Sequence, residues 1–142
     1  MILVDTGFLV ALAARRDKRH AAAMAVLAKL REPMITTWPV LTETCHLVGS
    51  RVSVDSSIAL HRSVYDGAFQ LFGLEHAHLV RAAELMTKYR DLPMDLADAS
   101  LVILAEELGT GRILSTDERD FGTYRWKNRR PFKNLFAAAL SA

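Results

Sequence analysis

The sequence has a single cysteine, few glycines and prolines, and no long apolar run. One cysteine among 142 residues excludes an internal disulfide framework and a cysteine-rich zinc site, and it favours a reducing, cytoplasmic location. The longest apolar stretches fall well short of the ~18 residues that suggest a membrane span, so we expect no membrane contact. Residues 1–4 carry no basic group and are followed at once by Asp5, which argues against a signal peptide.

Charge is nearly balanced, with 18 basic and 16 acidic residues and a formal net charge of +2. This excess is too small to indicate nucleic-acid binding by itself. The basic residues are unevenly distributed, because the stretch 125–133 holds five of them and no acid: Arg125, Lys127, Arg129, Arg130 and Lys133. A second basic cluster lies at 15–19. The remainder of the chain is therefore acidic, and the question is whether those acids converge.

The chain alternates short apolar runs with helical patterns. Its length and its 51% hydrophobic composition predict one compact domain spanning residues 1–142. We expect strands at 1–4, 34–37, 69–72 and 112–115, with a last strand at 131–135. We expect helices at 7–31 with a break near 16–18, at 39–50, from 53 or 55 to 65, at 75–90 and at 93–108. Such alternation predicts an α/β fold with a parallel sheet covered on both faces.

Acidic residues follow the expected strands or open the expected helices. Asp5 and Asp117 come directly after strands, Glu43 lies in the first turns of a helix, and Asp95 and Asp98 begin another. Because the carboxyl ends of parallel strands form one edge of the sheet, these acids are candidates for a common site. Each also has a purely structural explanation, as a helix cap, a turn residue or a favourable charge at a helix N-terminus.

Helical phase separates Asp95 from Asp98. At about 100° per residue, Asp98 lies roughly 55° from the centre of the buried face and Asp95 roughly twice as far. We therefore expect Asp98 to point toward the core and Asp95 toward the rim. A carboxylate directed inward needs a cation, a hydrogen-bond donor or a proton.

Four stretches in this order resemble the PIN-domain ribonucleases, especially the VapC-type toxins of bacterial toxin–antitoxin pairs. They are ILVDTGFL at 2–9, VLTE at 40–43, LADASL at 96–101 and RILSTDERDF at 112–121. The resemblance covers nearly the whole chain. It implies a three-layer α/β/α fold with a central parallel sheet of four to five short strands.

The resemblance also implies a metal-dependent endoribonuclease. Asp5, Glu43, Asp98 and Asp117 match the family's acids, which hold Mg²⁺ or Mn²⁺. Thr6 and Ser115 match positions that orient a carboxylate or a water, and we expect Asp95 to support them from the rim. The implied partners are an RNA substrate, a small antitoxin protein and a second copy of the chain in a homodimer. The family location is cytoplasmic.

Elementary electrostatics supports a divalent cation at this site. Four converging carboxylates repel one another, and some must take up a proton near neutral pH unless a cation is bound. Hard oxygen ligands favour Mg²⁺ or Mn²⁺ over zinc. Such an ion activates water for in-line hydrolysis of a phosphodiester, which leaves a 5′-phosphate and a 3′-hydroxyl.

The basic stretch admits two interpretations. Arg125, Lys127, Arg129 and Arg130 alternate with aromatic residues, a mixture that suits a phosphate backbone and stacked bases. The alternative is a solvated loop that its aromatics anchor to the core. The 15–19 cluster is a second candidate for RNA contact.

Two other functions remain open from the sequence. One is a catalytically inactive PIN-like domain that binds RNA or a protein. The other is phosphoryl transfer through an aspartyl nucleophile, but enzymes of that type carry a second acid two residues on, where this chain has Gly7. The five histidines lack metal-ligand spacing, and Cys45 lacks a motif partner, so we expect Cys45 to fill space in the core.

Overall fold

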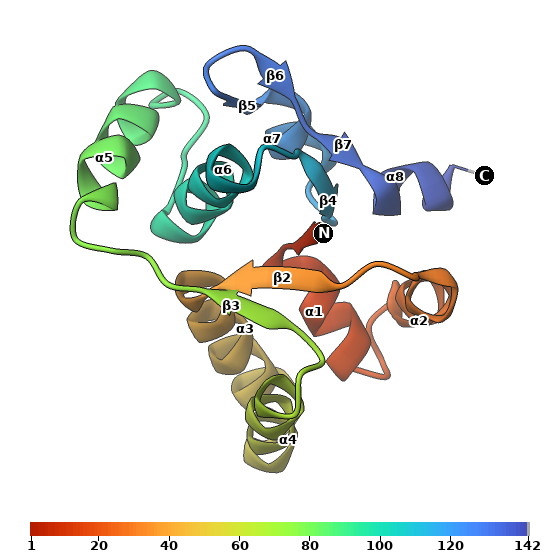
Figure 1. Ribbon diagram of the computed structural model, residues 1–142. Coiled ribbons are helices and arrows are strands. Elements are labelled where there is room, and N and C mark those ends of the chain that lie inside the picture. Colours follow the sequence, from red (N-terminus) through yellow and green to blue (C-terminus); the bar gives the residue numbers. More distant parts are fainter. Residues whose placement is uncertain (142) are drawn as a thin grey trace.

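A computed structural model describes residues 1–141 and places five short strands in one parallel sheet (Figure 1). The strand order is β3-β2-β1-β4-β7, so the first strand of the chain lies at the centre. The strands are β1 (Ile2–Val4), β2 (Met34–Thr37), β3 (Gln70–Phe72), β4 (Arg112–Leu114) and β7 (Lys133–Asn134). A separate antiparallel pair joins β5 (Arg125–Trp126) to β6 (Arg130–Pro131). The α/β class and the strand number predicted from the sequence are confirmed.

Helices cover both faces of the sheet. Figure 1 shows α1, α2, α3 and α4 on one side of the strands, and α5, α6 and α7 on the other. The helices are α1 (Thr6–Ala13), α2 (His20–Lys29), α3 (Trp38–Arg51), α4 (Val54–Tyr65), α5 (His78–Lys88), α6 (Leu96–Leu108), α7 (Glu118–Thr123) and α8 (Leu135–Leu140). Within residues 1–141 no helix combines the length and apolarity needed to cross a bilayer.

The core is built around β1 and α6. All three residues of β1 are fully buried, as expected for a strand covered on both faces. Along α6, every residue from 99 to 105 is buried. The two elements form a frame that fixes the carboxyl ends of β1 and β4 and the N-terminus of α6 relative to one another.

The helix expected at 7–31 is two helices. The first ends at Ala13, where the next residue is extended, and the second begins at His20. The break therefore covers residues 14–19, which is longer than the sequence suggested. Inside it the Asp17 carboxylate accepts a hydrogen bond from the Arg19 backbone N–H at 2.8 Å, a local bond that competes with helix formation. The helix expected at 75–90 is shorter and covers His78–Lys88.

The C-terminal strand expected at 131–135 is wrong in its bounds. β6 ends at Pro131, β7 covers only Lys133–Asn134, and Leu135 already begins α8. Asn134 determines this boundary, because its side-chain oxygen accepts hydrogen bonds from the backbone of Phe136 and Ala137 and caps the helix. The short helix α7 and the pair β5–β6 had no clear signal in the sequence.

Candidate active site

Asp5 lies at the centre of the site. It follows the central strand β1 and caps α1, and its Oδ1 accepts a hydrogen bond from the Thr6 backbone N–H at 2.7 Å. Its Oδ2 accepts a second bond from the Ser115 hydroxyl at 2.8 Å, and the residue is only 7% exposed. Burial raises the pKa of Asp5 to about 6, although the two hydrogen bonds oppose the shift. The negative charges of Glu43 and Asp117 raise this pKa further.

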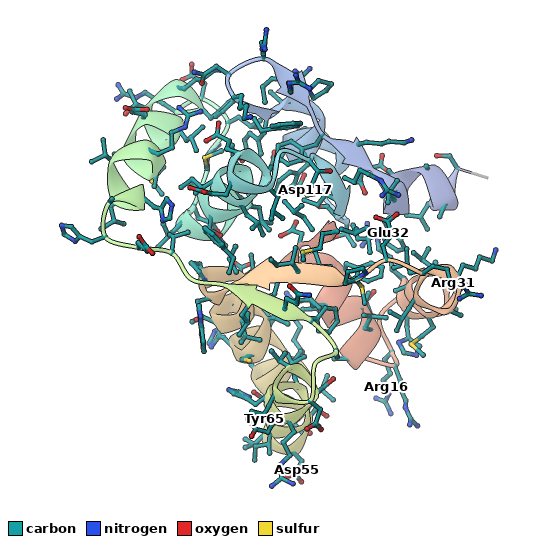
Figure 2. The ribbon with its side chains drawn as sticks, in the orientation of Figure 1. Arg16, Arg31, Glu32, Asp55, Tyr65 and Asp117 are labelled. Atoms are coloured by element: carbon teal, nitrogen blue, oxygen red, sulfur yellow. The ribbon has the colours of Figure 1, made fainter. Side chains whose placement is uncertain are left out.

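Asp117 enters the site from the end of β4. The Ser115 hydroxyl, which donates to Asp5, also accepts a bond from the Asp117 backbone N–H at 2.9 Å. The Asp117 carboxylate caps α7 through the backbone N–H of Asp120 at 3.0 Å. Burial raises the pKa of Asp117, and the neighbouring Asp120 adds to the shift. Figure 2 shows Asp117 near the middle of the molecule, on the side of the sheet that α6 and α7 cover.

Glu43 comes from α3, whose first turn is fixed to the core. Thr37 caps α3 by accepting a bond from the Val40 backbone N–H at 3.3 Å, and its hydroxyl lies 2.6 Å from the Ser100 hydroxyl of α6. Glu43 is half-buried, and this burial raises its pKa, with a further contribution from Asp95. The Thr6 hydroxyl lies on the side of Glu43 and lowers its pKa, which partly opposes the effect of burial.

Asp98 and Asp95 form a capping box at the start of α6. The Asp98 backbone N–H donates to Asp95 Oδ1 at 2.8 Å, and the Asp95 backbone N–H donates to Asp98 Oδ2 at 3.4 Å. Asp98 is half-buried and Asp95 is exposed, as helical phase predicted. Burial raises the pKa of Asp98 to about 8, and the charges of Asp95 and Asp5 contribute. Without a bound cation, Asp98 therefore holds a proton at neutral pH.

The structure brings Asp5, Glu43, Asp98 and Asp117 to one edge of the sheet. The charges of Glu43 and Asp117 act on Asp5, and the charge of Asp5 acts on Asp98. Asp95 lies near both Glu43 and Asp98, and its charge raises the pKa of each. Nevertheless, across residues 1–141 no three carboxylate, imidazole or thiol groups form a ready-made metal cage.

The residues fit a hard divalent cation held partly by water. All candidate donors are oxygens, and Mg²⁺ commonly binds through one or two carboxylates while keeping several waters. The Thr6 hydroxyl oxygen is buried next to Asp5 and has no hydrogen-bond partner within residues 1–141. An unsatisfied buried hydroxyl is costly, and an ordered water on a cation at this edge would satisfy it.

Gly7 and two residues that the sequence did not single out shape the site. The Tyr124 hydroxyl lies 3.4 Å from Asp98 Oδ2, and burial together with the neighbouring acids raises the pKa of this phenol far above its usual value. Asn134 brackets Ser115, accepting from its N–H at 3.2 Å and donating to its carbonyl at 2.9 Å. At Gly7, an added Cβ would lie 1.8 Å from Thr116 Oγ1, so only glycine lets α1 approach the loop that carries Asp117.

The histidines and Cys45 lie outside this arrangement, with one exception. His46 is exposed and lines a groove beside Glu43. Cys45 is half-buried rather than part of the core, and its Sγ lies 3.8 Å from His61 Nδ1, a contact that the sequence spacing did not indicate. Burial raises the pKa of the Cys45 thiol, which is the opposite of what a nucleophile needs.

The basic stretch forms the hairpin of β5 and β6 and lies away from the acids. The Arg125 guanidinium donates to the backbone carbonyls of residues 122, 123 and 124. At the tip, the Lys127 backbone N–H donates to Glu106, eight residues beyond Asp98 on α6 and therefore about 12 Å along its axis. Trp126 packs at Gly111, which precedes β4. Its ring also carries Lys127 and Arg130, at 5.8 and 5.3 Å from its centroid.

The other basic cluster is also remote. It lies in the loop after α1, whose first residue follows Asp5, so the helix length separates the two. Figure 2 shows Arg16 projecting away from Asp117 toward the bottom of the view. Neither basic cluster borders the acids directly.

Acidic residues clustered at the carboxyl edge of a parallel sheet form a site whose chemistry depends on carboxylates. It does not depend on cysteine or histidine. The chain matches the PIN domain over residues 2–127 and belongs to that family. The resemblance inferred from the four motifs is confirmed.

Two kinds of relatives agree with this assignment. Ribonuclease VapC26 of Mycobacterium tuberculosis is 32% identical over 124 residues, which are 87% of this chain and 92% of that protein. The crystal structure of M. tuberculosis VapC20, a sarcin–ricin loop cleaving toxin, superposes with a TM-score of 0.78 at 21% identity, covering 84% of this chain and 92% of the other. A toxin–antitoxin complex from Klebsiella pneumoniae gives a TM-score of 0.66 at 15% identity, covering 87% and 92%. The two solved structures support the fold.

Proposed function

We propose that this protein is an endoribonuclease that hydrolyses RNA phosphodiester bonds with Mg²⁺ or Mn²⁺, and that it is the toxin of a toxin–antitoxin pair. The observation that carries the proposal is the convergence of Asp5, Glu43, Asp98 and Asp117, with the pKa of each carboxyl raised by burial. A protein gains nothing in stability from gathering half-buried acids at one edge unless a cation is bound. Family membership and the ribonuclease relative agree with this reading.

In the proposed mechanism Asp5 is the fixed ligand. Hydrogen bonds from Ser115 and Thr6 hold its two oxygens in place, and Asn134 holds Ser115 in turn. Asp98 and Asp117 would complete the oxygen donors, directly or through water. When bound, the cation supplies a Lewis acid that neutralises the acids, polarises the phosphodiester and activates a water. Thr6 would orient that water through its unpaired hydroxyl.

Glu43 is the proposed proton acceptor. Its carboxylate accepts no backbone hydrogen bond within residues 1–141, unlike those of Asp5, Asp98 and Asp117, and would receive the proton of the attacking water. Burial and Asp95 raise its pKa, which moves it closer to the operating pH of a general base. The capping box holds Asp95 at the rim, where its charge acts on Glu43 and Asp98 without being buried itself.

The activity is tested with single-stranded RNA and protein stripped of metal. We expect cleavage only after Mg²⁺ or Mn²⁺ is added, with 5′-phosphate ends on the products. Asp5→Asn and Asp98→Asn should remove it, whereas Asp66→Asn, at an exposed acid ending α4, is the matched control and should not. RNA binding without cleavage at any metal concentration would instead identify a catalytically inactive PIN-like domain.

Toxin status and partners need separate experiments. Expression of the wild-type chain should arrest growth of a bacterial host, and expression of Asp98→Asn should not. A small protein encoded beside the gene should relieve the arrest and co-purify with the chain. Light scattering should give two chains per particle, because we also propose a homodimer. Normal growth with active nuclease present would reject the toxin proposal while leaving the enzymatic one intact.

A further inference from the structure

A groove of about 720 Å³ adjoins the acids, and its apolar residues have no part in the mechanism above. Its lining comes from the first turns of α3, from the start of α6 and from Leu74 between β3 and α5, and it includes Trp38, Thr42, Glu43, His46, Asp95 and Leu96. Glu43 and Asp95 belong both to this groove and to the acid cluster. A ligand in the groove would therefore lie beside the reacting phosphate.

Trp38 is the largest apolar surface in the groove. It is 56% exposed, and within residues 1–141 no aromatic ring or cation stacks on its indole. The other tryptophan of the chain, Trp126, is 6% exposed, and its Nε1 donates to the Pro131 carbonyl. Leu96 is 39% exposed and lines the same groove.

The position of Trp38 is fixed by the same contacts that fix Glu43. Trp38 is the first residue of α3 and follows the cap Thr37, whose hydroxyl lies 2.6 Å from the Ser100 hydroxyl of α6. The Thr42 hydroxyl donates to the Trp38 carbonyl at 2.9 Å. The two helices that form the walls are thus joined beside the groove, and the indole has a rigid backbone under it.

The charges of the groove select the kind of occupant. Its lining contains two acids, one histidine and no lysine or arginine, so a phosphate group would be repelled there. A neutral, flat and partly apolar group suits an exposed indole between apolar walls. In a single-stranded RNA that group is an unstacked base, which commonly stacks on aromatic side chains of proteins.

We propose that this groove binds one unstacked base of the RNA substrate against the face of Trp38, with the phosphate next to that base presented to the acids. The proposal rests on the proposed ribonuclease function. Leu96 closes the opposite wall, and Thr42 and His46 offer polar groups to the edges of the base. Trp38 is therefore a positioning residue that selects unpaired RNA.

The chain contains only two tryptophans, which makes a direct test possible. A short single-stranded RNA is titrated in Ca²⁺, which suppresses cleavage, and tryptophan emission is followed. We expect quenching in the wild type. Trp38→Phe should lose most of the quenching, because the remaining Trp126 is only 6% exposed, yet it should keep most of the affinity because phenylalanine also stacks.

Affinity is measured with labelled RNA by anisotropy. Trp38→Ala should weaken binding roughly 5- to 150-fold, which corresponds to the loss of one aromatic–base stack. Val54→Ala is the control, because Val54 is an apolar residue that is 69% exposed and begins α4. Its neighbour Asp55 lies at the end of α4 away from Asp117 in Figure 2, so RNA affinity should not change.

Several outcomes would overturn the proposal. Unchanged RNA affinity in a folded Trp38→Ala variant, as judged by its melting temperature, would reject base stacking. A change from dimer to monomer with unchanged RNA affinity would show that a second copy of the chain covers the groove. If the wild type binds RNA and quenches but never cleaves it with metal, the proposed enzymatic function fails while the base site stands.

Discussion

Asp98 is the residue whose charge depends most on what surrounds it. It receives hydrogen bonds from Tyr124 and from the Asp95 backbone, and it is repelled by two other acids. We expect Asp98→Asn to reduce cleavage by at least about 10²–10³-fold, because a transition-state contact and a cation ligand are lost together. The protein should stay folded, since an amide oxygen can accept the same bonds. Asp95→Asn should retain substantial turnover. The opposite order of effects would contradict the helical-phase argument.

The raised pKa values predict how metal-free stability varies with pH. The pKa of Asp98 is about 8 and that of Asp5 about 6 in the folded protein, whereas both titrate near 3.8 when unfolded. The folded protein therefore binds more protons than the unfolded chain between pH 4 and 8. The free energy of unfolding should fall as pH rises through this window and level off above it.

Thermal melting in a chelator checks this dependence. Asp98→Asn should melt close to the wild type at pH 5 and a few degrees higher at pH 8.5, because it cannot acquire the repelled charge. Mg²⁺ should stabilise the wild type more at pH 8.5 than at pH 5, since cation and proton compete for the same oxygens. If the melting temperature falls equally with pH in the wild type and in Asp98→Asn, Asp98 is not the buried titrating group.

At the scale of elements, the approach of α1 to the loop after β4 depends on Gly7. In Gly7→Ala the new Cβ would lie 1.8 Å from Thr116 Oγ1 and 3.0 Å from Thr116 Cβ. The overpacking cost of about 1–3 kcal/mol should exceed the ~1 kcal/mol gain in helix propensity. We expect a lower melting temperature and weaker cleavage, because Asp5 and Asp117 are pushed apart.

Two further variants make this result specific. Gly122→Ala is the matched control, because nothing lies within 4 Å of its added Cβ, and it should be neutral or slightly stabilising. Adding Thr116→Ala to Gly7→Ala removes the nearest atom and should restore part of the stability. A Gly7→Ala variant as stable and active as the wild type would show that the loop containing Thr116 can move away from α1 at little cost.

The elements that carry strong local patterns were predictable and the others were not. β1 and β4 are apolar runs, and α6 has an N-cap at Asp95 and a left-handed Gly109 after its end. In contrast, α7 and the β5–β6 pair are short and depend on distant contacts, such as the bond from the Arg125 N–H to the Tyr89 hydroxyl. The acids of the site could be predicted from the sequence because the carboxyl ends of parallel strands lie at one edge of the sheet. Tyr124 and Asn134 could not, since they reach Asp98 and Ser115 from 26 and 19 residues away.

At the scale of the whole molecule, the basic hairpin lies at a distance from the acids, which suits it to contact RNA beyond the cleavage point. Neutralising Lys127, Arg129 and Arg130 should weaken binding of single-stranded RNA alike for all sequences. Because log affinity falls with log salt by roughly 0.7 per phosphate neutralised, the slope should flatten by about two units. Titrations in Ca²⁺ at several salt concentrations measure it.

Arg125 is left intact in that variant, because its guanidinium donates to three backbone carbonyls and its loss would disturb the hairpin. Arg125→Gln alone is the structural control and should lower the melting temperature more than it changes the salt slope. If RNA affinity depends equally on salt in the wild type and in the triple variant, the hairpin does not contact RNA. Its role would then be purely structural.

The support of Asp5 by residues near position 134 has a consequence for shortened forms of the chain. Asn134 holds Ser115 against Asp5, and the ring of Phe136 packs on Phe8 with 5.1 Å between the ring centroids. We expect a chain ending at residue 127 to cut RNA far more slowly than residues 1–142. Loss of the segment after residue 127 would thus inactivate the site although all four acids are still present.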